Sequence, residues 1–187
     1  MAANDIMPFE SVSGGISRVR SGPLNASEAF FVGEPVAIQN AGEVTESNDD
    51  PVGSDIAGIA CEGPGASNVN PKTDTTYATS DVIQFWTAAP GDSFITKNYS
   101  TDGSTFNNAA PLVADIGVRA GLSLISNAWG FDTNASNKTV RLVDILDDQK
   151  ASVLRTRKVL TTSDTYYVVF AILSTQLTSP TDAEARV

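Results

Sequence analysis

The stretch GVRAGLSLISNAWGFDT, residues 117–133, predicts a strand, a reversal and a second strand. Apolar side chains stand at every second position of its first half, which is the repeat of a β-strand with one face on a core. The alternation predicts that the even-numbered side chains face the interior: Ile116, Val118, Ala120, Leu122 and Leu124. Arg119, Ser123 and the two glycines would then lie on the opposite face.

The second half of this stretch contains Asn127, Trp129, Gly130 and Asp132, residue types that also occur in sugar-binding rims and metal sites. We interpret Asn127 as the start of a reversal, after which AWGFD, residues 128–132, returns along a partner strand. A tryptophan beside a strand end more often fills a core than binds a ligand. Trp129 is therefore predicted to be a hydrophobic plug across a hairpin, with Asp132 in the adjoining turn.

Similar short runs, rich in aromatic and β-branched residues, recur along the chain between clusters of Gly, Pro, Asn, Asp and Ser. They are AFFVGEPVAIQ (29–39), DIAGIA (55–60), DVIQFWT (81–87), SFITKN (93–98), TVRLVDIL (139–146) and TYYVVFAIL (165–173). Both faces of the last run are apolar, so it should lie between two layers or in a closed barrel. Only residues 147–159 have some helical character. The pattern predicts a mainly β domain over residues 29–187, built as a mostly antiparallel sandwich or small antiparallel β-barrel.

Residues 1–28 follow neither the helical nor the strand period for long, so we expect an extended N-terminal arm. Two interpretations are open: a disordered tail, or an arm that becomes ordered on a neighbouring chain. In the second, the partner-binding residues of the arm would be Ile6, Met7, Phe9, Val12, Ile16, Arg18 and Arg20.

The composition limits the chemistry that this chain can perform. It has 187 residues, a net charge of -10, no histidine and a single cysteine, Cys61. The acidity argues against nucleic acid as a partner. Without histidine, most hydrolase triads and zinc sites are excluded, and a lone cysteine forms no internal disulfide. We therefore expect no enzyme activity, no metal and no cofactor.

No positively charged leader and no apolar run of about 20 residues, the length that spans a bilayer, is present. The expectation is a soluble protein, made in the cytoplasm, with no membrane partner.

Acidic pairs occur at Asp49 and Asp50 and at Asp147 and Asp148, in polar segments where we expect them to be solvated turns. The segment ESNDDPVGSD, residues 46–55, offers oxygen donors for calcium but lacks the spacing of a calcium loop. A glycosidase pair among the many carboxylates remains a minor alternative.

Four of the twelve basic residues fall in one short span: Lys150, Arg155, Arg157 and Lys158. One interpretation is a solvated face. The other is an electrostatic contact with an acidic partner, including the acidic part of an identical subunit, in which Arg155, Arg157 and Lys158 bind.

From residue 30 to about 148 the order of segments resembles that of the decoration, or cement, proteins of tailed-bacteriophage capsids. The resemblance is carried by FFVGEPVAIQNAGEVTE, DIAGIACEG, DVIQFWTAAPGDSFIT and GVRAGLSLISNAWGFDTNASNKTVRLVDILDD. It implies a small β-barrel or β-tulip domain on the outer surface of a virion, assembled in the host cytoplasm. The implied partner is the major capsid protein, which a homotrimer would clamp to stabilise the shell, without catalysis.

A carbohydrate-binding or adhesin-like β-module is the alternative function. Trp86, Tyr99 and Trp129 stand among loops rich in Asn and Ser, and aromatic faces with polar rims suit sugars.

Overall fold

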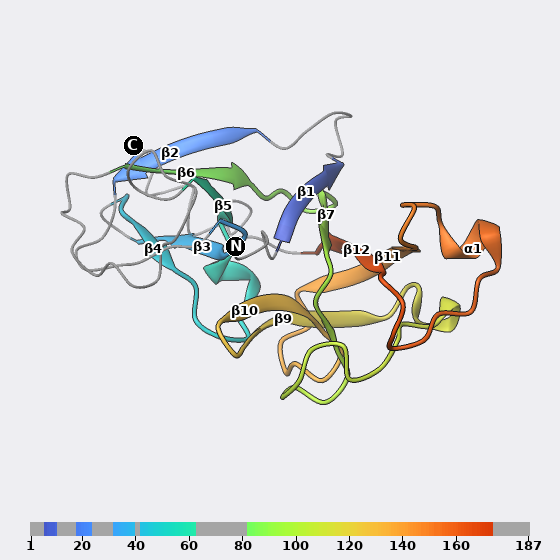
Figure 1. Cartoon of the computed structure of the whole chain (residues 1–187). Coiled ribbons are helices and arrows are strands. Elements are labelled where there is room, and N and C mark those ends of the chain that lie inside the picture. Colours follow the sequence, from blue (N-terminus) through green and yellow to red (C-terminus); the bar gives the residue numbers. More distant parts are fainter. Residues whose placement is uncertain (1–5, 11–17, 24–31, 40–41, 63–81, 174–187) are drawn as a thin grey trace.

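The computed structural model describes residues 6–10, 18–23, 32–39, 42–62 and 82–173. Over these residues the chain is mainly β and forms one seven-stranded and one five-stranded sheet (Figure 1). Within the described ranges each sheet is open and ends in two edge strands. The mainly β class is confirmed. Of the two architectures that we expected, a sandwich or a barrel, the described strands form two open sheets and no closed barrel.

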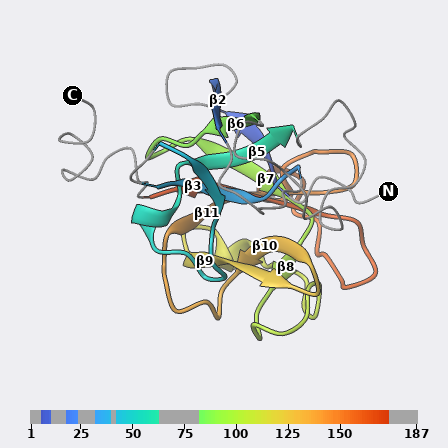
Figure 2. The ribbon, with the colours of Figure 1, turned by 90° about the vertical axis from the view of Figure 1, so that its left-hand side faces the viewer.

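The strands of the seven-stranded sheet are, in spatial order, β1 (Ile6–Glu10), β7 (Ser93–Thr96), β12 (Tyr167–Ile172), β11 (Val140–Leu146), β9 (Arg119–Ile125), β10 (Ala128–Asp132) and β8 (Tyr99–Ser100). Those of the five-stranded sheet are β2 (Val19–Pro23), β6 (Val82–Thr87), β5 (Gly58–Glu62), β3 (Pro35–Ile38) and β4 (Val44–Glu46). Neighbouring strands pair antiparallel except β10 and β8. In Figure 2 the five-stranded sheet lies above β8, β9 and β10.

Helical structure is sparse in the described ranges. It consists of α1 (Val153–Thr156) and two short 3-10 turns, Gly53–Asp55 and Val113–Asp115. None of these is long and apolar enough to cross a membrane.

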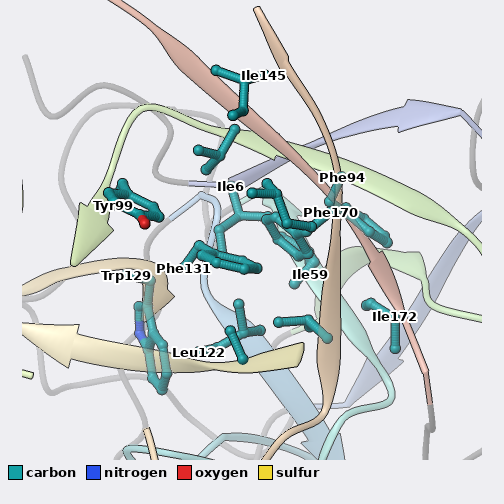
Figure 3. Packing of buried hydrophobic residues seen from close by; sticks show 14 of the residues in the cluster. Ile6, Ile59, Phe94, Tyr99, Leu122, Trp129, Phe131, Ile145, Phe170 and Ile172 are labelled. Carbon is teal, nitrogen blue, oxygen red and sulfur yellow. The ribbon is translucent and has the colours of Figure 1, made fainter. Parts of the chain in front are cut away.

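The main core lies on the inner face of the seven-stranded sheet and includes Ile59 of β5 from the other sheet. Its centre is aromatic: the ring centroid of Phe170 lies 6.3 Å from that of Phe94 and 5.9 Å from that of Phe131 (Figure 3). Tyr99 stacks on Phe131 with a centroid separation of 6.0 Å. A smaller cluster within the five-stranded sheet contains Val36, Val44, Ala60, Ile83 and Phe85.

Strands β9 and β10 form the hairpin that the opening stretch predicts. Ile125 pairs with Ala128, and the two residues between them, Ser126 and Asn127, have φ of 52° and 64°. Positive φ at both central positions is the requirement of a type I′ turn, whose twist matches that of the two strands. Trp129 is fully buried, which confirms its predicted role as a plug.

The two faces of β9 differ from the prediction in detail. Ala120 and Leu122 are fully buried as expected, but Val118 is 37% exposed because β9 begins only at Arg119. The opposite face is also covered: the loop after β10 lies so close to Gly121 that a side chain there would collide with Asn137 and Ala135. Ser123 is buried on this face as well, where its hydroxyl donates to the Asp132 carboxylate at 2.9 Å.

Strand β12 has apolar residues on both faces, and both are buried. Phe170 belongs to the main core, while Val169 on the other face packs with Ile95 and Leu146. The strand lies between β7 and β11, which confirms that it is an interior strand with covered faces.

The described parts of residues 1–28 are strands of the domain. β1 pairs with β7, and β2 pairs with β6 of the other sheet. Ile6 is fully buried in the main core. An arm extending away from the domain therefore does not describe these two segments, because their backbones complete sheet edges of their own chain.

The acidic loop after β4 is bonded to the seven-stranded sheet. Asp49 accepts a hydrogen bond from the backbone N–H of Leu124 at 2.7 Å, and Asp50 accepts from those of Ser136 and Asn137 at 2.8 and 3.0 Å. Asp49 is exposed, as expected of a solvated turn, but both carboxylates also satisfy backbone donors of distant segments, which the sequence did not indicate.

Candidate interaction surface

The residues that the sequence singled out for partner binding do not gather in one place. Ile6 lies in the core, Met7 is half-buried beside Ile95, and Phe9 is 46% exposed at the end of β1. Arg18 and Arg20 are exposed at β2, in the other sheet. Val12 and Ile16 lie outside the described residues.

The basic segment Arg155–Lys158 remains, and it stands beside an exposed apolar surface. In Figure 1 α1, which precedes it, lies at the end of the molecule away from the five-stranded sheet. Four aliphatic side chains are exposed here: Leu112 by 55%, Val113 by 40%, Leu154 by 58% and Val159 by 81%.

These side chains border a pocket of about 490 Å³, which we call the α1 groove. The groove is lined by Pro111, Leu112, Val113, Val153, Leu154, Arg157, Lys158, Val159 and Leu160. An exposed apolar patch rimmed by polar residues is a candidate interaction site.

One wall of the groove is α1 and the chain that follows it. Val153 anchors the helix because its side chain is 1% exposed, and the Ser152 hydroxyl donates to the Asp144 carboxylate of β11 at 2.8 Å. The helix ends at Arg157, whose φ of 54° turns the chain away while its N–H still bonds to the Val153 carbonyl at 2.8 Å. Leu160 is 6% exposed and returns the chain to the core.

The turn that leads into α1 depends on Asp147. Its carboxylate accepts hydrogen bonds from the backbone N–H groups of Gln149 and Ala151 at 3.0 and 2.9 Å. Between them Lys150 has a φ of 60°. Asp147 is thus the buried centre of a turn, where we expected a solvated acidic pair.

The opposite wall is held by two buried phenols. The Tyr99 hydroxyl donates to Asp115 at 3.1 Å, and the same carboxylate accepts from the N–H of Leu112 at 2.7 Å. The Tyr166 hydroxyl contacts Asn107 at 2.9 Å and the carbonyl of Ala109 at 3.1 Å.

Both phenols stay protonated at neutral pH and serve as donors. Burial raises the pKa of Tyr166 to about 12. Burial and the neighbouring Asp115 carboxylate raise the pKa of Tyr99 above its ordinary value. Both hydroxyls can therefore donate the hydrogen bonds that join this wall to the core.

The basic side chains around the groove differ in whether they have an acidic partner. Lys158 lies between two carboxylates, with its Nζ 3.4 Å from Asp148 and 3.5 Å from Asp164. Hydrogen bonds from Thr161, together with Lys158, hold the pKa of Asp164 below its usual range. Among the residues that the structure describes, neither Arg155 nor Arg157 has an acidic partner.

Sequence reasoning found the arginines of this surface but missed its exposed aliphatic residues. The exposed aliphatic residues could have been found from pairs of adjacent aliphatic residues in the sequence, of which only one can reach the core. Val153 is 1% exposed and Leu154 58%, and Val159 is 81% exposed and Leu160 6%. Successive side chains point in different directions, so one member of each pair faces the core and the other is left outside.

A second pocket, of about 580 Å³, lies between β3, β4 and the acidic loop and is lined in part by Glu46, Asp49 and Asp55. Asp49 is engaged by the N–H of Leu124. Across the described ranges no three His, Cys, Asp or Glu side chains are grouped to hold a metal ion.

The aromatic residues that suggested a sugar site lie mostly in the core. Trp129 is fully buried and Tyr99 is 2% exposed, so neither ring offers a face to a ligand. Trp86 is half-buried. Two of the three aromatic residues that suggested carbohydrate binding are therefore not accessible to a sugar.

Comparisons of the chain with protein-family models, with curated proteins and with solved structures found no match.

Proposed function

We propose that this protein is a structural component of a tailed-bacteriophage virion that binds the outer surface of the capsid. In this role it clamps neighbouring subunits of the major capsid protein as a homotrimer, and it performs no catalysis. The proposal is supported chiefly by one observation, the exposed aliphatic side chains of the α1 groove. An accessory protein that must adhere to a finished shell needs such a surface for docking.

The groove is small, so one copy of it would bind weakly, and strong binding to a shell would need several copies that bind together. Full burial of one aliphatic side chain contributes roughly 1.5–3 kcal/mol before the costs of association are subtracted. Four such side chains give a modest contact for one copy. A trimer would present the same contact three times to a shell whose binding sites repeat, so the linked contacts would reinforce one another.

The charge of the chain agrees with a place on the outside of a particle. A net charge of -10 disfavours contact with the packaged genome and keeps decorated particles from adhering to one another. Arg155 and Arg157, which have no acidic partner in the part of the chain that the structure describes, are an exception to this acidity and suit the face that meets the shell.

Co-sedimentation with undecorated capsids tests the proposal. The wild-type chain should pellet with the shells and raise the temperature at which they break. Leu154→Ser should weaken pelleting, because it removes an exposed aliphatic side chain of the groove. Val82→Ser is the matched control, since Val82 is 54% exposed on β6 in the other sheet and should be replaceable without effect. No pelleting and no gain in heat resistance with the wild-type chain would refute the function.

A further inference from the structure

We infer that the α1 groove recognises a protein segment in which aliphatic side chains are flanked by carboxylates. The inference rests on the proposed function, in that the segment would belong to the major capsid protein. It goes further by stating the chemistry that the partner must carry.

The apolar half of the inference follows from what lines the groove. Val153 and Leu160 are almost fully buried beside it, while Leu112, Leu154 and Val159 are more than half exposed around it. An aliphatic side chain inserted between them would remove apolar surface from water on several sides at once.

The acidic half follows from the two arginines. The Lys158 ammonium has two carboxylates of its own chain within 3.5 Å, so its positive charge is already paired within the protein. Arg155 and Arg157 have none among the described residues, and both are exposed. A guanidinium binds a carboxylate through two parallel N–H···O bonds, which makes it the more selective cation for such a partner.

The two arginines differ in their position relative to the groove. Arg157 ends α1 in a left-handed conformation and lines the groove directly, whereas Arg155 lies beyond the lining. We therefore expect one carboxylate of the partner to be recognised by Arg157 next to the aliphatic contact. A second, less stringent carboxylate position would face Arg155.

The test selects peptides from a random twelve-residue display library on the immobilised full-length protein. Peptides that bind should be enriched in aspartate or glutamate beside leucine, isoleucine or valine. Their affinity should fall about tenfold or more on Arg157→Asn, because a charge-assisted hydrogen bond is lost while asparagine tolerates the left-handed backbone. Arg157→Lys should restore part of the loss, and Val82→Ser should leave the affinity unchanged.

Three results would overturn the inference. The first is a failure to enrich any peptide, and the second is an enriched set without carboxylates or insensitive to Arg157→Asn. The third is a change of the protein from oligomer to monomer on Leu154→Ser in sedimentation velocity, since a second copy would then occupy the groove.

The same variants separate this inference from the proposed function. Wild-type pelleting with capsids that persists unchanged in Leu154→Ser and Arg157→Asn would leave the function standing and remove the groove from it. Selection of acidic and aliphatic peptides by a chain that does not pellet with capsids would refute the function and uphold the chemistry of the groove.

Discussion

Asn137 donates two hydrogen bonds to Asp50 across 87 residues of chain, one from its backbone and one from its side chain. The Asp50 carboxylate accepts from the backbone N–H of Asn137 at 3.0 Å, and the Asn137 side-chain amide donates to the Asp50 carbonyl at 2.6 Å. This pairing fastens the loop after β4, in the five-stranded sheet, to the loop between β10 and β11 of the other sheet. The contact between the sheets thus includes a polar connection in addition to the apolar core.

Replacement of Asp50 by alanine should destabilise the protein. The N–H groups of Ser136 and Asn137 lose their acceptor, and a φ of 51° at residue 50 disfavours alanine, so we expect a loss of about 2–4 kcal/mol. Asp50→Asn should cost less, because asparagine keeps one acceptor oxygen and tolerates the backbone. Denaturant unfolding measures both. Equal unfolding midpoints for Asp50→Ala and wild type would contradict the role of this pairing.

Truncation of Ile6 should also destabilise the folded domain. Its side chain is fully buried in the main core, and Ile→Ala at such positions costs about 2–5 kcal/mol. Phe9→Ala in the same strand is the control, because Phe9 is 46% exposed and its loss should cost at most about 1 kcal/mol. Thermal unfolding distinguishes the two variants. If both leave stability unchanged, β1 is not part of the fold.

The hairpin turn should respond to residue 127 in opposite directions. Asn127 has a φ of 64°, so Asn127→Gly should raise the free energy of unfolding by up to about 1 kcal/mol. Asn127→Val should lower it by about 1–2 kcal/mol, since a β-branched residue is strained in this conformation. Chemical denaturation checks the sign. A stabilising valine would show that this turn is not left-handed in solution.

Alkaline pH should unfold the protein through its buried phenols. Folding raises the pKa of Tyr166 from 10.0 to about 12, so the folded state favours the neutral phenol. The associated stability is complete below pH 10 and is lost as the pH rises through about 12. Tyrosinate absorbance should therefore report late ionisation that coincides with loss of structure. Tyr166→Phe should remove one late phenol from this titration, and an unchanged curve would count against its burial.

The prediction from sequence was most accurate where a local pattern determines the structure. The alternation before Ser126 and the two apolar faces of residues 166–173 correctly gave β9, the hairpin and the interior strand β12. Such patterns depend only on neighbours along the chain. Val118 was misplaced because a repeat of two residues marks a face but not the first paired residue.

Features that depend on distant partners could not be derived in this way. The pairing of Ile6 with Thr96 and the bonds of Asp50 to Ser136 and Asn137 leave no trace in local composition. The number of sheets is a similar case, because strand periodicity does not specify whether a sheet closes. Leu112 and Leu154 resemble core residues in the sequence, and only the structure shows that they lie outside.

The position of β12 affects when the protein can fold during its synthesis on the ribosome. This strand comes last among the described elements, yet it occupies an interior position in its sheet, between β7 and β11. The nascent chain therefore cannot complete that sheet until residue 172 has left the exit tunnel. Until then the earlier strands of that sheet have unpaired edges, so folding should be slow, and a stalled or truncated chain is at risk of aggregation.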